Sequence, residues 1–165
     1  MSYRMVSIDI EFPGIVYRPV NVDKHELGKV PPIWNYQVIR DNVNSNIIQL
    51  GLALCDDKGS LPHFGTGCQY VWEFNFNNFD VYNDLQNPES IELLERQGID
   101  FDKNLKEGID SADFAALMLE SGLLGDHSAF TWVTFHGAYD IAYLMKILIR
   151  QPLPYDLMGF MNPSL

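Results

Sequence analysis

The nine residues RMVSIDIEF at positions 4–12 alternate between apolar and polar side chains. Valine and isoleucine occupy the even positions 6, 8 and 10, and Asp9 and Glu11 fall between or beside them. A period of two residues is typical of a β-strand, in which successive side chains point to opposite faces. The stretch therefore predicts a strand with one apolar face and with both carboxylates on the other face.

The Asp9–Glu11 pair is the first candidate functional site. Residues i and i+2 of a strand share a face, so the two carboxylates can share a hard divalent cation through oxygen ligands. The apolar flanking sequence favours a central strand, where uncompensated carboxylates would be costly. The alternative is the polar face of an edge strand, because D-x-E alone is a weak signal.

The remaining elements favour an α/β fold, with a mixed sheet and helices packed on it. Strands are predicted at 47–56 and 69–76, as an antiparallel pair, and at 131–136. Helices are predicted at 36–42, 88–97, 111–121 and 138–150, from proline, glycine and aspartate signals at their ends. No clear element is predicted for 154–165, which we expect to be an irregular tail.

Composition indicates one globular domain over residues 1–165. The chain is 47% hydrophobic and 13% aromatic, with 22 acidic against 11 basic residues and a net charge of −11. That charge disfavours a broad basic groove for nucleic acid, but not a narrow carboxylate site that holds metal ions.

We expect no membrane span and no targeting segment. Two cysteines favour a reducing compartment, so we expect the cytoplasm, with the nucleus as an alternative.

The second candidate site is FHGAYD at 135–140, where a strand ends and a helix begins. Asp140 lies in the first turn of that helix, where a carboxylate can simply complement the helix dipole. His136 follows an apolar strand, a position more typical of a structural histidine than of a ligand or base. Tyr139 and Tyr143 could pack in the core or face a base, and the sequence leaves both alternatives open.

Several separate motifs, in the right order, resemble one protein family. They are SIDIEFPGIVYRP at 7–19, NVNSNIIQLGLAL at 42–54, WEFNF at 72–76, SIELLERQGIDF at 90–101, EGID at 107–110 and TFHGAYDIAYLMKIL at 134–148. Together they make residues 4–155 similar to the Caf-one/Pop-two type deadenylases of the CCR-NOT complex, which are DEDD-superfamily 3′–5′ exoribonucleases. The resemblance implies a ribonuclease-H-like sheet with three antiparallel strands and one parallel strand.

The resemblance also implies a site. In that family four acids hold two Mg²⁺ or Mn²⁺ ions, and the enzyme removes poly(A) as nucleoside 5′-phosphates. Asp9 and Glu11 match the first motif and Asp140 matches the second, so all three are expected as catalytic residues and metal ligands. No separate cofactor-binding residue is implied. The scaffold of the CCR-NOT complex is the implied protein partner.

The third motif of the family has no counterpart here. It should supply a fourth aspartate after a histidine, yet Asp156 is the only acid after Asp140, and no histidine follows His136. We therefore expect a truncated fold without the fifth strand and terminal helices, a vestigial site and weak or absent metal binding. The favoured function is protein–protein contact, through a homodimer, another protein or the CCR-NOT scaffold. The alternatives are an active poly(A) exoribonuclease and a fragment without its own function.

The absent fifth strand gives a further expectation. The strand at 131–136 should become an open, apolar edge that a second copy can pair with. We expect the tail at 154–165 to help cover that edge.

Overall fold

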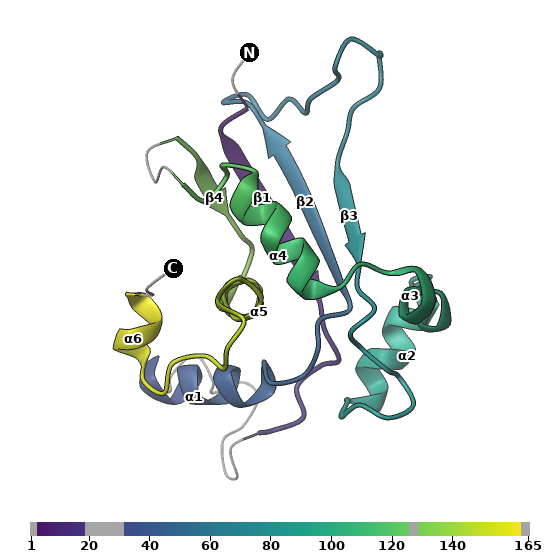
Figure 1. Ribbon diagram of the computed structural model, residues 1–165, viewed down its shortest axis with the longest axis vertical. Helices are drawn as coiled ribbons and strands as arrows, with labels where there is room; N and C mark the ends of the chain where they lie inside the picture. Colours follow the sequence, from purple (N-terminus) through teal and green to yellow (C-terminus); the bar gives the residue numbers. More distant parts are fainter. Residues whose placement is uncertain (1–2, 19–31, 126–128, 163–165) are drawn as a thin grey trace.

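The computed structural model describes residues 3–18, 32–125 and 129–162. Within this part of the chain, helices lie around one twisted sheet (Figure 1). The strands are β1 (Met5–Glu11), β2 (Gln49–Cys55), β3 (Trp72–Asn75) and β4 (Thr131–Val133). The helices are α1 (Pro32–Asn42), α2 (Pro88–Arg96), α3 (Phe101–Glu107), α4 (Ser111–Glu120), α5 (Ala138–Ile149) and α6 (Leu157–Met161).

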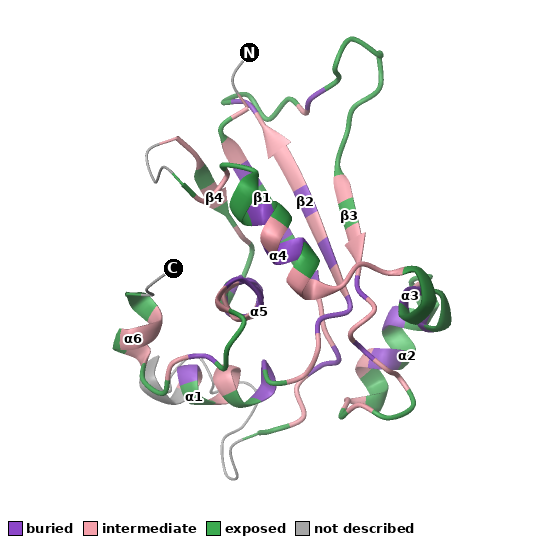
Figure 2. Cartoon of the chain, viewed as in Figure 1, coloured by how far each residue is buried: buried purple, intermediate pink, exposed green. Residues whose placement is uncertain are grey.

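The sheet has the strand order β3-β2-β1-β4 among the described residues. β1 pairs antiparallel with β2, β2 pairs antiparallel with β3, and β4 runs parallel to β1. The predicted mixed sheet is confirmed, and β1 is central, as its apolar flanks indicated. The even-numbered apolar residues of β1 are buried while Ser7 and Asp9 are exposed, so the alternation read from the sequence is the alternation of the fold (Figure 2).

Helices α4 and α5 lie together over one face of this sheet (Figure 1). The buried side of α5 includes Tyr143, Leu144 and Ile147, which join the residues of β1 in the main core. Phe114 of α4 packs edge-on against Phe74 and Phe76, at centroid distances of 4.9 and 5.3 Å. This packing leaves the opposite face of β1, which carries Asp9, open to solvent.

Strand β4 is shorter than predicted. The sequence predicted a strand over 131–136, but the strand ends at Val133 because the chain turns sharply at His136, where φ is +52°. α3 was not predicted; it is a short helix, which Asp100 caps by accepting a bond from the Lys103 amide.

The expectation of an irregular tail is wrong for Leu157–Met161, which forms α6. Asp156 caps this helix by accepting a bond from the Gly159 amide. The short helix forms because that cap satisfies its first turn, although the apolar spacing gave no clear signal.

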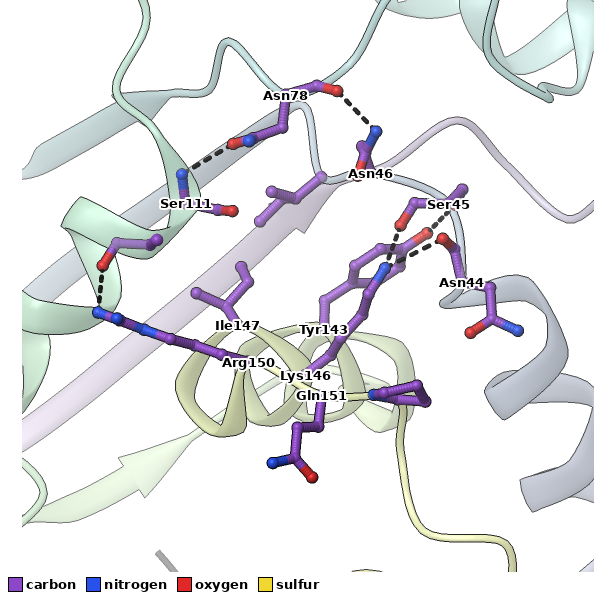
Figure 3. A pocket seen from close by; sticks show the side chains of 13 residues that line it. Asn44, Ser45, Asn46, Asn78, Ser111, Tyr143, Lys146, Ile147, Arg150 and Gln151 are labelled. Atoms are coloured by element: carbon purple, nitrogen blue, oxygen red, sulfur yellow. Dashed lines mark hydrogen bonds between the residues drawn. The ribbon is translucent and has the colours of Figure 1, made fainter.

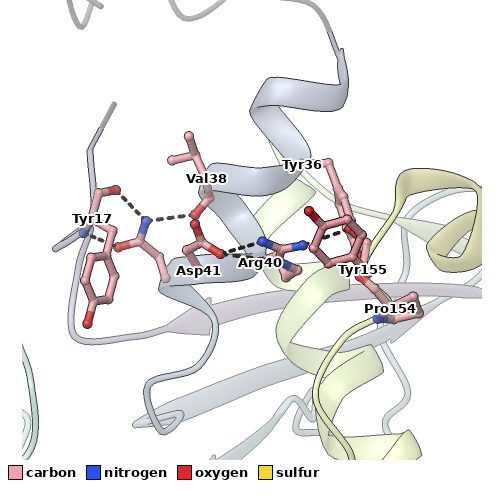
Figure 4. Close-up of polar contacts among 8 residues, drawn as sticks. Tyr17, Tyr36, Val38, Arg40, Asp41, Pro154 and Tyr155 are labelled. Carbon is pink, nitrogen blue, oxygen red and sulfur yellow. Dashed lines mark hydrogen bonds and ion pairs between the residues drawn. The ribbon is translucent and has the colours of Figure 1, made fainter. Parts of the chain in front are cut away.

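The tail also does not cover the sheet edge as expected. It packs against α1, where Tyr36 donates to the Pro154 carbonyl and its ring lies 5.1 Å from Phe160. Arg40 donates to the Tyr155 carbonyl at 2.8 Å, and its Cζ lies 4.8 Å from the centre of the Tyr155 ring (Figure 4). These contacts fix the tail beside α1, and β4 remains an edge strand of the described sheet.

None of the helices in the described ranges has the length and apolar character needed to span a membrane.

Candidate functional site

The three predicted acids come from two elements that meet at the end of β1. Asp9 is exposed on the open face of β1, opposite Gly51 of β2. Glu11 is the half-buried last residue of the same strand. Asp140 lies in the first turn of α5 and is only 8% exposed. The fold thus brings Asp140 to the first motif across 130 positions of sequence.

One hydrogen bond joins Asp140 to the strand. The backbone amide of Ile10, between the two other acids, donates to Asp140 Oδ1 at 2.8 Å. β4 pairs with β1 only as far as Ser7, so Ile10 lies beyond that pairing. Asp140 therefore supplies a buried amide with the acceptor that a longer β4 would have supplied. A role in the helix dipole alone would not account for this contact.

The three carboxylates influence one another electrostatically. Burial raises the pKa of Glu11, and the charges of Asp9 and Asp140 raise it further. Burial also raises the pKa of Asp140, the Ile10 amide opposes that rise, and Asp9 adds to it. Mutual repulsion of this kind is relieved by a proton or by a cation.

The donor set is chemically suitable for Mg²⁺ or Mn²⁺, because carboxylate oxygens are the ligands of hard cations. The geometry is not that of an assembled site. Among residues 3–18, 32–125 and 129–162, no three His, Cys, Asp or Glu side chains converge as a group that could hold a metal ion. Asp140 has one oxygen engaged by Ile10, and Asp156 caps α6. The residues present do not form a ready two-metal centre.

The two tyrosines left open by the sequence pack beside these acids. Tyr139 stacks on Phe12 with centroids 5.0 Å apart and ring planes 13° apart, and burial raises the pKa of Tyr139 to about 12. Tyr143 is buried, and its hydroxyl lies 2.6 Å from Ser45 Oγ. The rings of Phe12, Tyr139 and Tyr143 pack together and hold α5 against the end of β1.

The turn between β4 and α5 belongs to the second candidate site, FHGAYD at 135–140, that the sequence indicated. His136 is exposed rather than buried, and its ring contacts Phe135 edge-on at 4.7 Å. Gly137 is required because a Cβ there would lie 2.0 Å from Thr134 Oγ1. Phe135 is 88% exposed. Residue 135 is exposed like residues 131 and 133 of the preceding strand.

A cavity of about 470 Å³ lies elsewhere, between α5, the start of α4 and the loop at 44–47 (Figure 3). Its two cations are engaged by the backbone. Lys146 Nζ donates to the carbonyls of Val43, Asn44 and Ser45 at 2.8–3.1 Å, and Arg150 donates to the Ala112 carbonyl at 2.7 Å. The predicted acids do not line it, so the cavity is separate from the candidate site.

Comparison with known proteins gives a consistent result. The model of the CAF1 family ribonucleases matches residues 2–119. The chain is 45% identical over 161 residues to the Arabidopsis thaliana protein named probable CCR4-associated factor 1 homolog 7, covering 96% of this chain and 56% of the relative. It is 46% identical over 159 residues to the Schizosaccharomyces pombe poly(A) ribonuclease pop2, and the match covers 96% of this chain and 44% of that relative. The chain thus spans about half the length of these curated relatives.

Solved structures agree with the sequence matches. The Mg²⁺- and Mn²⁺-bound form of S. pombe Pop2p superposes with a TM-score of 0.82 at 45% identity, covering 97% of this chain and 60% of that one. CAF1 co-crystallised with the yeast NOT1 MIF4G domain superposes with a TM-score of 0.74 at 37% identity, and the match covers 96% of this chain and 54% of that one. The ribonuclease-H-like fold predicted from the motifs is confirmed, and the chain belongs to the CAF1 family of ribonucleases.

Proposed function

We propose that this 165-residue chain is a deadenylase-like protein with a defective catalytic centre, which acts through protein contacts. The observation that carries this proposal is the arrangement of Asp9, Glu11 and Asp140. They lie close enough to repel one another, yet the described residues provide no converged group of three ligands. Two-metal phosphodiester hydrolysis requires both ions to be held precisely, so we expect little chemistry from this arrangement.

The proposed protein partner is a scaffold of the NOT1 type. Support comes from the similar structure in which CAF1 is co-crystallised with the NOT1 MIF4G domain. The contact should be measured by calorimetric titration of this chain with such a domain. Saturable one-to-one binding is expected, and an absence of heat at tens of micromolar protein would contradict it.

The catalytic part of the proposal is tested by incubating the protein with oligo(A) and Mn²⁺. We expect negligible release of nucleoside 5′-phosphate, and no difference between the protein and its Asp9→Ala variant. Titration with Mn²⁺ alone should show at most one weak site, because three incompletely assembled carboxylates leave most of the coordination to water. Rapid release that Asp9→Ala abolishes, together with two tight Mn²⁺ sites, would refute a defective centre.

The second candidate function is an active, metal-dependent 3′–5′ exoribonuclease on poly(A). Relatives named poly(A) ribonucleases and the mutual repulsion of the three acids favour it. A cation would relieve that repulsion and draw the carboxylates together. This function requires a further carboxylate, which a second copy could provide.

We also propose that two copies associate through the edge of β4, and that the protein works in the cytoplasm. The open edge of the described sheet supports the first statement. Microscopy of a fluorescent fusion tests the second.

A further inference from the structure

Strand β3 is the second open edge of the sheet. It comes last in the strand order, and within the described residues β2 is its one partner strand. Phe76, just after β3, donates to the Ile48 carbonyl just before β2, so the even-numbered residues direct their backbone groups toward β2. Backbone groups along an antiparallel strand alternate in direction, so those of Glu73 and Asn75 point outward from the sheet.

Part of this edge is closed and part is open. The Ile109 amide donates to the Asn75 carbonyl at 2.8 Å, and the Asn77 amide donates to the Ile109 carbonyl at 3.2 Å. The contact goes no further along β3, because the residues before Gly108 form α3. Among the described residues, the outward amide and carbonyl of Glu73 have no backbone partner. Another extended chain can add to such an edge as a strand.

A groove of about 510 Å³ lies beside this open edge, between β3 and α3. α3 is next to the end of β3 (Figure 1). The polar side chains that line the groove include Gln49, Glu73, Asn75, Lys103, Asn104 and Glu107. Sites for small organic ligands are mainly apolar, so this polar groove is better suited to a chain that brings its own backbone hydrogen-bonding groups.

Asn104 supplies an observation that is independent of the strand edge. Its side chain is only 8% exposed, and its Nδ2 is buried without a hydrogen-bond partner among the described residues. An unpaired buried amide donor is unfavourable and rare in native proteins. Because Asn104 lines the groove, rotation of its amide group can present Nδ2 to a carbonyl oxygen of a chain that lies there.

The charges around the groove select the kind of chain. Three acids, Glu73, Asp100 and Glu107, line it with one base, Lys103. The acids repel the phosphates of a nucleic acid, and Glu73 repels the same edge of a second copy. In an added strand, the residue opposite Glu73 shares its face, and residues two apart share that face too. Basic side chains at alternate positions would therefore complement the groove.

We infer that the edge of β3 binds an extended peptide segment of another protein, with Lys or Arg at alternate positions. The segment adds to the sheet as a strand beside Glu73, and one of its carbonyls accepts a hydrogen bond from Asn104. This surface is at the other edge of the described sheet from β4. Its use requires neither catalysis nor association of two copies.

The test is an NMR titration of the isotope-labelled full chain with a hexapeptide of alternating threonine and lysine, blocked at both ends. We expect saturable shifts of the Glu73 and Asn75 amides and of the Asn104 side-chain amide. Glu73→Lys should weaken binding at least about tenfold, because repulsion replaces attraction. Glu120→Lys makes the same charge change at the exposed end of α4, so this matched control should change the affinity by less than about twofold.

Two methylated peptides test the strand pairing itself. Methyl groups on the lysine amides block one edge of the extended peptide, and methyl groups on the threonine amides block the other edge. One of the two peptides should lose about tenfold or more in affinity while the other retains binding, and the one that loses affinity shows the direction of the added strand.

Asn104→Leu tests the buried amide. It should bind the unmethylated peptide about threefold to tenfold more weakly, because a hydrogen bond to the peptide is lost. Its midpoint of urea unfolding should not fall, because the change removes an unpaired donor from the interior. A purely structural role of Asn104 would instead lower the midpoint and leave the affinity unchanged.

Four outcomes would each overturn the inference. They are equal binding of the two methylated peptides, equal losses in Glu73→Lys and Glu120→Lys, shifts confined to Thr131–Val133, and no saturable shifts at millimolar peptide. Full affinity of Asn104→Leu would remove Asn104 from the site. None of these results bears on the oligo(A) and MIF4G-domain measurements, so a failure here is distinguishable from a failure of the proposed function.

Discussion

At the scale of single residues, Asp140 has a structural role in joining α5 to β1. Its carboxylate accepts the otherwise unpaired amide of Ile10. Asp140→Ala should lower the free energy of unfolding by about 1–2 kcal/mol, because a buried donor loses its acceptor. Asp140→Asn keeps an acceptor oxygen and removes the repulsion by Asp9, so its stability should stay within about 0.5 kcal/mol of the unmodified protein. Urea unfolding distinguishes the two, and equal losses would show that the bond is unimportant.

The raised pKa values of Glu11 and Asp140 predict a dependence of stability on pH. A carboxyl whose pKa is higher in the folded state binds its proton more tightly there, so folding is favoured at low pH. That contribution is complete below the ordinary values of 4.5 and 3.8 and is lost as the pH rises through the raised values. Glu11→Gln removes one of the repelling charges. It should therefore unfold like the unmodified protein below pH 4 and be more stable by about 0.5 kcal/mol at pH 7.

Thermal unfolding of the two proteins across this pH range provides the measurement. The control is Glu120→Gln at the exposed end of α4, remote from the site. If Glu11→Gln is less stable than the unmodified protein at neutral pH, then a favourable contact of Glu11 outweighs the repulsion.

At the scale of elements, local patterns predicted what local forces decide. Alternation located β1 and its faces, and the proline at position 88 and the Asp110 cap located the starts of α2 and α4. The end of β4 could not be predicted in this way, because it depends on the fit of Gly137 against Thr134. The hydrogen bond between Asp140 and Ile10 could not be predicted from local pattern either, since it joins positions 130 residues apart. Only the family resemblance placed those acids together.

The α5 helix also closes the end of α1, and this contact can be tested. Lys146 is half-buried, burial lowers its pKa, and its ammonium donates to three carbonyls that follow α1. Lys146→Met keeps most of the aliphatic chain but removes every donor, so it should cost about 1.5–3 kcal/mol of unfolding free energy. Lys106→Met, at an exposed lysine of α3, should change stability by less than about 0.5 kcal/mol. Similar losses in both variants would mean that the three carbonyls contribute little.

At the scale of the whole molecule, the net charge of −11 opposes association of two copies. One segment, however, carries no acidic side chain that would repel a second copy. Between Asp126 and Asp140 the sequence contains no Asp, Glu, Lys or Arg, and this segment includes the edge strand β4. Sheet edges are usually protected by charges, bulges or coverage, and α6 lies against α1 instead. Two β4 edges related by a two-fold axis can pair antiparallel and satisfy each other's backbone groups.

We therefore expect sedimentation velocity to show a dimer that forms as concentration rises. Val133→Lys should shift the protein to monomer, because it places a charge of the same sign from each copy on the shared edge. The matched control is Val71→Lys. Val71 is 62% exposed, but it precedes β3, which is the strand at the other edge of the sheet. It should leave the dimer intact. A monomer at every concentration, or a dimer that both lysine variants disrupt equally, would exclude the β4 edge as the contact between copies.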